Sequence, residues 1–394
     1  MLGIHNLADF LRKIKRTTAV ANYKTECYNL SMPGSKKQEK LNWPLVGNSH
    51  IIDFLSKSLV NEKIANAYIF FGPQDLGKAT VANYFAKSLL CQSKAKFRKG
   101  EIVSPCGECV SCQAFTRIKK SNSGQSQKED AGIIHGDLHL IEREKDKKNI
   151  SIEQAREFIK GLSLSSFLGS YKVGIIKEAD SLSLEAANAL LKTLEEPKEK
   201  VVIILIAANL ESIPATIVSR SQVLNFYPVK TDIIHNYLVD EHKVSRSLAK
   251  NFSKISLGRP ALAVKFLKDK DFYKDYTDKA KIFLDFARQD INERLAGIEK
   301  IIGAGFSGQE SSKRALRILE IWQGVARDLL LLDLGQKDLI QHHIMIEEFA
   351  QQRGKFNPGV AVLINMVKNL EAGKEYLRAN VNPKLVLENI AINI

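Results

Sequence analysis

Four of the five cysteines in this 394-residue chain lie close together in the sequence. Their spacing is Cys91-x14-Cys106-x2-Cys109-x2-Cys112. Four thiolates satisfy tetrahedral Zn²⁺ and leave no open position, which is typical of a structural zinc site. An iron–sulfur cluster also takes four cysteines and is the main alternative, whereas buried core cysteines do not suit so polar a segment. The cluster therefore predicts structural zinc, and Cys27 has no comparable neighbours.

Residues 72–78 fit the pattern G-x-x-x-x-G-K, which binds phosphate when it lies between a strand and a helix. Gly72 and Gly77 allow the backbone N–H groups to turn toward a phosphate, and Lys78 neutralises its charge. Ala79 stands where the pattern has a hydroxyl that ligates magnesium. Thr80 follows about 100° further round the helix, so it cannot simply replace that ligand. The pattern predicts nucleotide binding without ordered magnesium; the alternative is a structural turn.

An ATPase with such a loop also needs an apolar strand that ends in Asp-Glu. Here the apolar residues 173–176 are followed by Lys177 and Glu178. Lysine stands where a carboxylate would hold magnesium, while Glu178 keeps the water-polarising position. Because Ala79 and Lys177 both affect the metal, we expect weak or no ATP hydrolysis. The alternative is that Lys177 and Glu178 are ordinary exposed residues at a strand end.

The elements that must position these motifs alternate between strand and helix. Strands are predicted at residues 67–71, 133–141, 173–176, 201–207 and 223–226, and helices at 51–59, 80–90, 152–162 and 184–195. This order is typical of a parallel α/β sheet. From about residue 230 onward the periodicity is helical. His135 and His139 fall in the second predicted strand, which favours structural roles over a metal-binding pair.

The composition is that of a globular protein, with 44% hydrophobic and 26% charged residues. No charge-free apolar run is long enough to cross a membrane, and no secretory signal is evident, so we expect a cytoplasmic protein with no membrane partner. The net charge of +14 favours contact with a polyanion such as nucleic acid. Residues 1–40 and 92–129 each carry eight basic against three acidic residues. Much of the charge therefore lies in an extension and an insertion.

In this order, the motifs resemble the bacterial clamp-loader subunits of the AAA+ class, and most closely the delta-prime subunits of DNA polymerase III. The most specific segment is the run Asn-Ala-Leu-Leu-Lys-Thr-Leu-Glu-Glu-Pro at residues 188–197. The other matching segments are residues 43–47, the phosphate loop, 90–91 with 105–112, 135–139 and 219–221. The resemblance covers residues 43–265, and the last third matches only in being helical.

The resemblance implies a role for one arginine above all. Ser219-Arg220-Ser221 falls on the family's Ser-Arg-Cys motif, in which the arginine is a finger inserted into the ATP site of a neighbouring subunit. A guanidinium can donate several hydrogen bonds to a transferring phosphate. Asn209 lies about where the family has its first sensor residue, and Arg259 where it has the second sensor arginine. The alternatives are a surface arginine at Arg220 and a helix-capping residue at Arg259.

The resemblance also implies a domain order and a function. The order is an extension at 1–40, an AAA+ α/β domain at 41–229 with a zinc module at about 91–112, a helical lid at 230–270 and a helical collar at 271–394 that oligomerises. Met32 is an alternative start. The implied function is a delta-prime-like stator that helps to load the sliding clamp onto primer–template DNA with the tau/gamma and delta subunits. One alternative is an ATP-hydrolysing tau/gamma-like clamp-loader motor or a related AAA+ ATPase. Another is a zinc-dependent DNA-binding protein, which has little aromatic support beyond Phe115.

Overall fold

The computed structural model describes residues 43–93, 105–114, 136–144, 147, 149–166, 171–286, 289–302, 309–346 and 359–393. The predicted extension, with Cys27 and Met32, lies outside these residues, as do Phe115 and His135. Contacts divide the chain into two compact units, the first made of residues 1–144 and 148–233 and the second of residues 145–147 and 234–394.

The first unit contains a five-stranded parallel sheet with the strand order β2-β3-β4-β1-β5. The strands are β1 (Ala67–Phe71), β2 (Leu138–Ile141), β3 (Lys172–Ile176), β4 (Val201–Ala207) and β5 (Gln222–Asn225). Phe71 at the end of β1 pairs with Ala207 at the end of β4, and Ile176 at the end of β3 pairs with Leu205. The carboxyl ends of these three strands therefore meet at one edge, where parallel sheets bind ligands. The predicted parallel α/β fold is confirmed.

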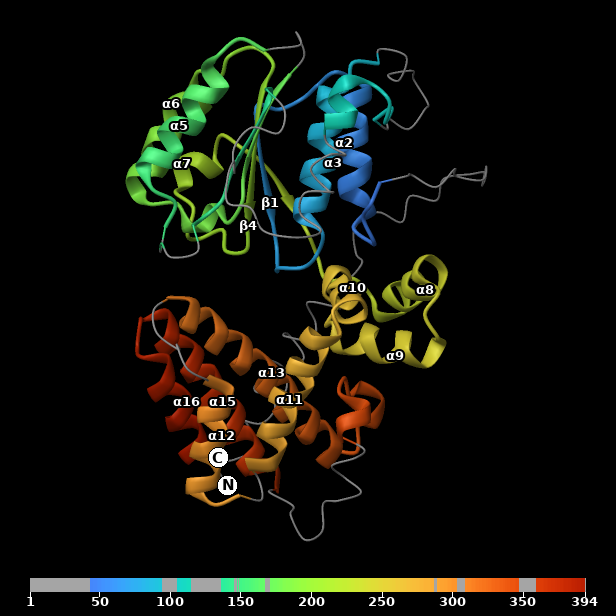
Figure 1. Cartoon of the computed structure of the whole chain (residues 1–394), viewed down its shortest axis with the longest axis vertical. Helices are drawn as coiled ribbons and strands as arrows, with labels where there is room; N and C mark the ends of the chain where they lie inside the picture. The colour runs from blue at the N-terminus through green and yellow to red at the C-terminus, as the bar shows by residue number, and fades with distance from the viewer. Residues whose placement is uncertain are drawn as a thin grey trace, which may run out of the picture. The chain divides into compact units, whose positions relative to one another are not determined.

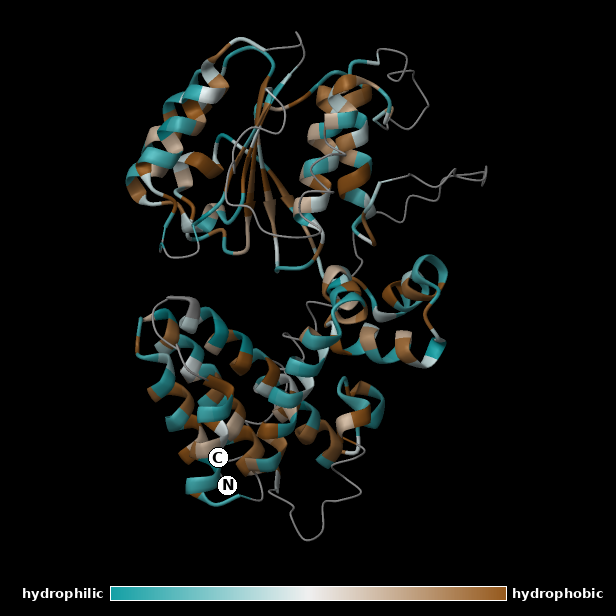
Figure 2. Ribbon diagram, in the orientation of Figure 1, coloured by the Kyte–Doolittle hydropathy of each residue, from teal (hydrophilic) through white to brown (hydrophobic). Residues whose placement is uncertain are grey.

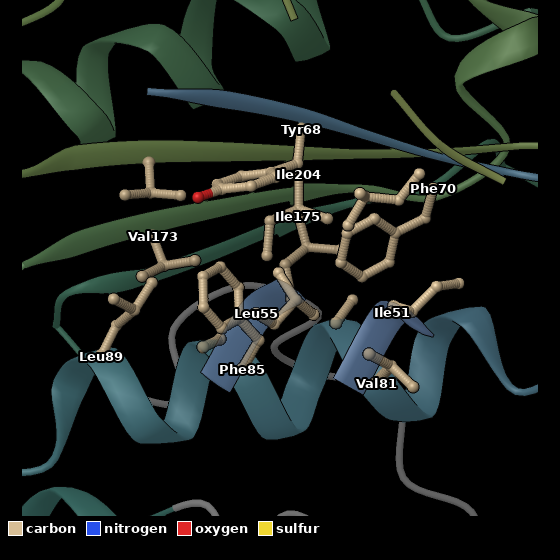
Figure 3. Packing of buried hydrophobic residues seen from close by; sticks show 14 of the residues in the cluster. Ile51, Leu55, Tyr68, Phe70, Val81, Phe85, Leu89, Val173, Ile175 and Ile204 are labelled. Carbon is tan, nitrogen blue, oxygen red and sulfur yellow. The ribbon is translucent and has the colours of Figure 1, made fainter. Parts of the chain in front are cut away.

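Helices cover both faces of the sheet (Figure 1). One face carries α2 (Ser49–Val60) and α3 (Lys78–Leu90), and the other carries α5 (Ile152–Ser163), α6 (Leu184–Glu195) and α7 (Ala215–Val218). Side chains alternate along β1, because Tyr68 and Phe70 pack toward α3 while Ile69 packs on the opposite face. Figure 3 shows Phe85 of α3 among the strand residues of this core. The strands are brown in Figure 2, as expected for a sheet buried on both faces.

Local signals in the sequence explain where the helices of this unit begin and end. Ser151 caps α5 through a capping box with Gln154, and the Ser183 hydroxyl caps α6 by accepting a hydrogen bond from the Ala186 N–H at 3.1 Å. The helix α6 ends just before Pro197, which cannot continue it. A single 3₁₀ turn, η2 (Ala179–Ser181), follows β3.

The described residues of the second unit form helices joined by turns and contain no strand, which agrees with the prediction from sequence periodicity. Its elements are α8 (Thr231–His242, which begins in the first unit), α9 (Arg246–Ile255), α10 (Pro260–Lys268), α11 (Lys270–Phe286), α12 (Ile291–Ile302), α13 (Gln309–Asp333), the 3₁₀ turn η3 (Lys337–Leu339), α15 (Gly359–Arg378) and α16 (Pro383–Ile392). Trp322 of α13 is fully buried, stacks on Phe283 of α11 and donates its indole N–H to the Lys279 carbonyl at 3.0 Å. None of the described helices is long and apolar enough to span a membrane.

Candidate functional site

The phosphate loop connects the carboxyl end of β1 to α3, which is the context that its sequence pattern requires. Gly72 has φ of 144°, and a Cβ there would lie 2.4 Å from the backbone oxygen of Phe226. Gly77 caps α3 with φ of 90°. Both backbone conformations favour glycine, and the first also leaves no room for a side chain. These two predicted residues therefore shape a loop that carries the amino end of α3, where an anion is stabilised.

The side chain of Lys78 lies within this loop rather than in solvent. Its Nζ donates hydrogen bonds to the carbonyl oxygens of Gly72 and, at 2.6 Å, of Pro73. Burial lowers the pKa of Lys78 to about 8, although the carboxylates of Asp180 and Asp75 oppose the shift. At pH 7 the ammonium group is still mostly protonated, so it can pair with an anion.

The first turn of α3 does not present a hydroxyl to the loop at the position after the lysine. Ala79 is half-buried and packs against the core between the sheet and the α2 and α3 helices. Thr80 is exposed, one residue further along the same turn. The helix thus offers a methyl group where a magnesium ligand would be needed, as the sequence indicates.

Two ion pairs join the segments that follow β2 and β3. Lys177 Nζ lies 2.7 Å from the Glu142 carboxylate, and Arg143 Nε lies 3.0 Å from the Glu178 carboxylate. The pairs arise because Ile141 and Ile176, the last residues of the two strands, are partners in the parallel register. The Arg143 side chain is only 6% exposed, so its charge needs the Glu178 carboxylate nearby. Glu178 therefore faces a cation within its own chain.

Asp180 connects the carboxyl ends of β3 and β4. Its Oδ2 accepts hydrogen bonds from the backbone N–H groups of Ala208 at 3.4 Å and Asn209 at 3.3 Å, and its charge also acts on Lys78. The Asn209 side chain is engaged locally, because it donates to Ser212 at 2.9 Å and accepts from the Glu211 N–H at 3.1 Å. The predicted first sensor residue thus lies beside an acid that faces the loop.

Arg220 follows α7 and is partly exposed, with 38% of its side chain accessible. One guanidinium nitrogen, NH1, donates to the Thr216 carbonyl at 3.0 Å and approaches the Ser219 hydroxyl at 3.4 Å. The other, NH2, lies 2.9 Å from the carboxylate of Glu195, the last residue of α6. The backbone around Arg220 is fixed by the turns that end α7, so the side chain projects from a defined point.

Arg259 belongs to the second unit. It precedes Pro260 and forms the N-cap position of α10, but its side chain does not cap that helix. Its Nε donates to the Ser256 carbonyl at 3.2 Å, and its NH1 lies 3.9 Å from the Glu320 carboxylate on α13. Within the second unit, the predicted second sensor arginine is therefore paired with a helix of the expected collar.

The four predicted cysteine ligands come together in space, and all four Sγ atoms lie within 4.8 Å of one another. Cys91 follows α3 directly, Cys106 and Cys109 come from the bend around Gly107, which has φ of 79°, and Cys112 lies in the helical residues 110–114. The Sγ of Cys106 lies 3.6 Å from that of Cys91 and 3.8 Å from that of Cys112. One ion bound to four sulfurs at about 2.3 Å separates them by about 3.8 Å. The donor set and its spacing fit a single tetrahedral ion; in a cluster with four irons, each thiolate binds a different iron and the sulfurs lie further apart.

Backbone N–H groups point at the sulfurs, which favours thiolates. The N–H groups of Cys106, Cys109 and Cys112 donate to the sulfurs of Cys91, Cys106 and Cys109 at 3.4, 3.3 and 3.4 Å. Burial raises the pKa of Cys106, but hydrogen bonds from the N–H groups of Cys109 and Glu108 outweigh it and lower that pKa to about 6. Burial raises the pKa of Cys112 to about 12. A bound cation would stabilise all four thiolates together.

His139 lies in β2 and does not belong to the cysteine cluster. Its ring packs where a Cβ on Gly161 of α5 would be, and its Nε2 is buried. Burial and the charge of Lys172 lower the pKa of His139, so the ring is neutral at pH 7. The prediction of a structural role is consistent with this packing.

Comparison with known proteins agrees with these features. The family model described as "DNA polymerase III, delta subunit" matches residues 47–230. The DNA polymerase III subunit delta' of Bacillus subtilis is 25% identical over 342 residues, which is 87% of this chain and 94% of that protein. The delta' subunit of Pseudomonas aeruginosa is 33% identical over 156 residues, 40% of this chain and 41% of that protein. Over residues 47–230, this chain therefore matches the family of DNA polymerase III clamp-loader subunits.

The tau subunits among the matches align with about half of this chain and with a smaller share of their own length. The DNA polymerase III subunit tau of Bacillus subtilis is 31% identical over 203 residues, which is 51% of this chain but only 32% of that longer protein. A gamma subunit-related protein of Thermotoga maritima has a solved structure with a TM-score of 0.45 and 17% identity, covering 86% of this chain and 97% of that one.

The structure gives some residues of this chain a role that the sequence does not indicate. Sequence reasoning does not single out Asp180, although it lies two residues after Glu178 in the same motif. It also does not single out Glu142 and Arg143, because their partners are known only once β2 and β3 are paired. Glu195 lies in the most specific family segment, but nothing in the sequence indicates that it contacts Arg220.

Proposed function

We propose that this chain is a delta-prime-like stator of the clamp loader, which lends an arginine to a neighbouring ATPase subunit and hydrolyses little or no ATP itself. The observation that carries this proposal is the ion pair between Lys177 and Glu142. It puts an ammonium group at the end of β3, where a motor needs a carboxylate to hold magnesium. Ala79 removes the second magnesium ligand. Both losses affect the same ion, which hydrolysis requires.

The proposal assigns roles to the remaining residues of the site. Gly72, Gly77 and Lys78 form a loop that can still hold the phosphates of ATP weakly, with Thr80 beside it and Asn209 at the end of β4. Glu178 is a remnant of the catalytic motif whose carboxylate now pairs with Arg143. Arg259 takes the second sensor position at the start of α10.

Arg220 acts outside its own subunit in this proposal. It is partly exposed and follows the short helix α7, so the guanidinium is accessible to another chain. The match to the Bacillus subtilis delta' subunit, which extends over most of both chains, supports the same assignment. The partners are then the tau/gamma and delta subunits, with the sliding clamp and primer–template DNA reached through the assembled ring in the cytoplasm. The AAA+ domain, the lid at 230–270 and the collar at 271–394 follow the family's order.

One observation favours the alternative function, an ATP-hydrolysing tau/gamma-like motor subunit. The phosphate loop keeps both glycines and its lysine in a geometry that accepts an anion. A tau/gamma-like motor would need magnesium to bind without the two missing ligands. Asp180 is an acid whose charge acts on Lys78, but its carboxylate already accepts two backbone hydrogen bonds.

Two measurements on the purified protein distinguish a stator from a motor: complex formation with the other subunits and ATP hydrolysis by the chain alone. We expect the chain to form a stable complex with the tau/gamma and delta subunits of its own organism in size-exclusion chromatography. We expect the chain alone to show no magnesium-dependent ATP turnover above that of the Lys78→Ala variant, which controls for contaminating ATPases. Turnover that Lys78→Ala abolishes would show that the chain is a motor.

We propose that Zn²⁺ is the ion held by Cys91, Cys106, Cys109 and Cys112, with a structural role. Metal analysis of the purified chain should find about one equivalent of zinc per chain, because the four thiolates fill a tetrahedral shell. Cys109→Ser should lose most of this zinc, whereas Cys27→Ser, the matched control, should keep it. Iron in place of zinc, with visible absorbance, would contradict the assignment.

A further inference from the structure

The guanidinium of Arg220 is already occupied by groups of its own chain. Its NH1 donates to the neutral Thr216 carbonyl at 3.0 Å, and its NH2 pairs with the Glu195 carboxylate at 2.9 Å. Glu195 ends α6 and Thr216 lies in α7, and these two helices contact each other (Figure 1). Neutral acceptors, the Thr216 carbonyl and the more distant Ser219 hydroxyl, therefore hold NH1, while the charged Glu195 carboxylate holds NH2.

We propose that Glu195 is a positioning residue that holds Arg220 in the free subunit and is displaced by a nucleotide phosphate of the neighbouring subunit. The inference rests on the proposed role of Arg220 as a trans-acting finger. A phosphate offers several charged oxygens in the geometry that a guanidinium binds, so it can replace a single carboxylate oxygen. Thr216 keeps the side chain aligned while the exchange takes place at NH2.

The exposure of the pair makes this exchange easy. The side chains of Arg220 and Glu195 are 38% and 49% exposed. Water solvates both charges, and ion pairs of this kind contribute little to stability. Neither group is left buried and unpaired when the contact breaks. Glu195 can therefore release Arg220 without disturbing α6 or α7, whereas a buried pair would resist separation.

Removing the charge of Glu195 should change the rate of ATP hydrolysis at the neighbouring site in a predictable direction. A carboxylate that competes with phosphate for the guanidinium lowers the reactivity of the neighbouring site. A carboxylate that only supports the arginine would raise it. Removing the charge at Glu195 therefore increases hydrolysis if the residue competes, and decreases it if the residue is merely structural.

The test uses the reconstituted complex with its ATPase subunits and measures kcat/KM for ATP in single-turnover experiments. Glu195→Gln keeps the size and an acceptor oxygen but removes the charge. We expect kcat/KM to rise about two- to fivefold at low salt, the range of an exposed ion pair. The ratio to the wild-type complex should approach one as salt screens the charge. Glu196→Gln, which changes the adjacent exposed glutamate, is the matched control and should leave the rate unchanged.

A double variant shows whether Glu195 acts through Arg220. In an Arg220→Ala background, Glu195→Gln should not change the rate of ATP hydrolysis further, because Glu195 acts on that rate only through the Arg220 guanidinium. If Arg220→Ala slows hydrolysis but Glu195→Gln leaves it unchanged or lowers it, the role given to Glu195 is wrong and the finger stands. If Arg220→Ala changes nothing, the finger and the role of Glu195 are both overturned.

Discussion

Asp328→Asn is expected to lower the free energy of unfolding of the second unit by about 3 kcal/mol, since it breaks a buried, fully paired charge. Asp328 of α13 is 0% exposed. Its Oδ2 accepts hydrogen bonds from the N–H groups of Gln341 at 2.9 Å and His342 at 2.7 Å, and lies 2.8 Å from His342 Nδ1. Its Oδ1 accepts from Arg327 at 3.0 Å. One carboxylate thus fastens the segment after η3 to α13.

The substitution is costly because an amide cannot accept on both sides. A carboxylate has two acceptor oxygens, whereas asparagine offers one oxygen and an NH₂ donor. In either orientation the NH₂ group faces a donor, either Arg327 or the N–H groups of residues 341 and 342. The network extends further, because the Tyr276 hydroxyl lies 2.7 Å from His342 Nε2. Burial raises the pKa of Tyr276, so it stays a neutral phenol that can donate to the imidazole.

Urea unfolding followed by the fluorescence of Trp322 measures this effect. The chain has two tryptophans, so a Trp43→Phe background leaves Trp322 of α13 as the reporter for the second unit. Asp338→Asn, at an exposed position in η3, is the matched control and should stay within about 0.5 kcal/mol of the parent. An Asp328→Asn midpoint that matches this control would contradict the stabilising role of the network.

Arg220→Ala is expected to slow ATP hydrolysis at one neighbouring site of the reconstituted ring by about 10³-fold or more, the usual effect of losing an arginine finger. The guanidinium is lost from the point where charge builds on the transferring phosphate. Arg220→Lys should recover only part of the rate, because a single ammonium group cannot form the same set of hydrogen bonds. The stability of the free chain should hardly change, because the side chain is exposed and its ion pair is weak.

Single-turnover hydrolysis measured for that one site is the appropriate readout. Other sites in the ring would receive their arginines from other subunits, so the steady-state rate of the whole complex should fall less. Arg246→Ala, at an exposed position in the second unit, is the control for loss of a surface arginine. Assembly should be unaffected in both variants. An unchanged single-site rate in assembled Arg220→Ala complexes would contradict the finger.

Much of the fold follows from short-range patterns. The predicted strands at 67–71 and 201–207 and the helix at 184–195 match β1, β4 and α6, because apolar runs, serine caps and Pro197 act within a few residues of the elements they define. The cysteine cluster is equally local for three of its members. Gly107 and the spacing of Cys106, Cys109 and Cys112 already indicate a metal-binding turn.

Partners far apart along the chain could not be predicted in this way. The sequence does not show which group pairs with Lys177. Only the register between β2 and β3 places it beside Glu142, which is 35 residues away. Tyr276 and His342 are separated by 66 residues and meet only when α11 and the segment after η3 pack on α13. Periodicity shows that a helix or strand has a buried face, but it does not show which face of another element covers it.

The residue types and their spacing thus indicated the α/β and helical halves, the phosphate-loop pattern, the cluster of four cysteines, the residues that depart from the magnesium-binding motifs and the resemblance to clamp-loader subunits. Tertiary packing decided how the charges are paired: Glu178 with Arg143, Asp180 with the end of β4, and Arg220 with Glu195. The physical reason is one of range. Backbone conformation and hydrophobic periodicity depend on neighbours within a turn or two of the chain, whereas ion pairs and buried networks depend on strand order and helix contacts that only the whole fold creates.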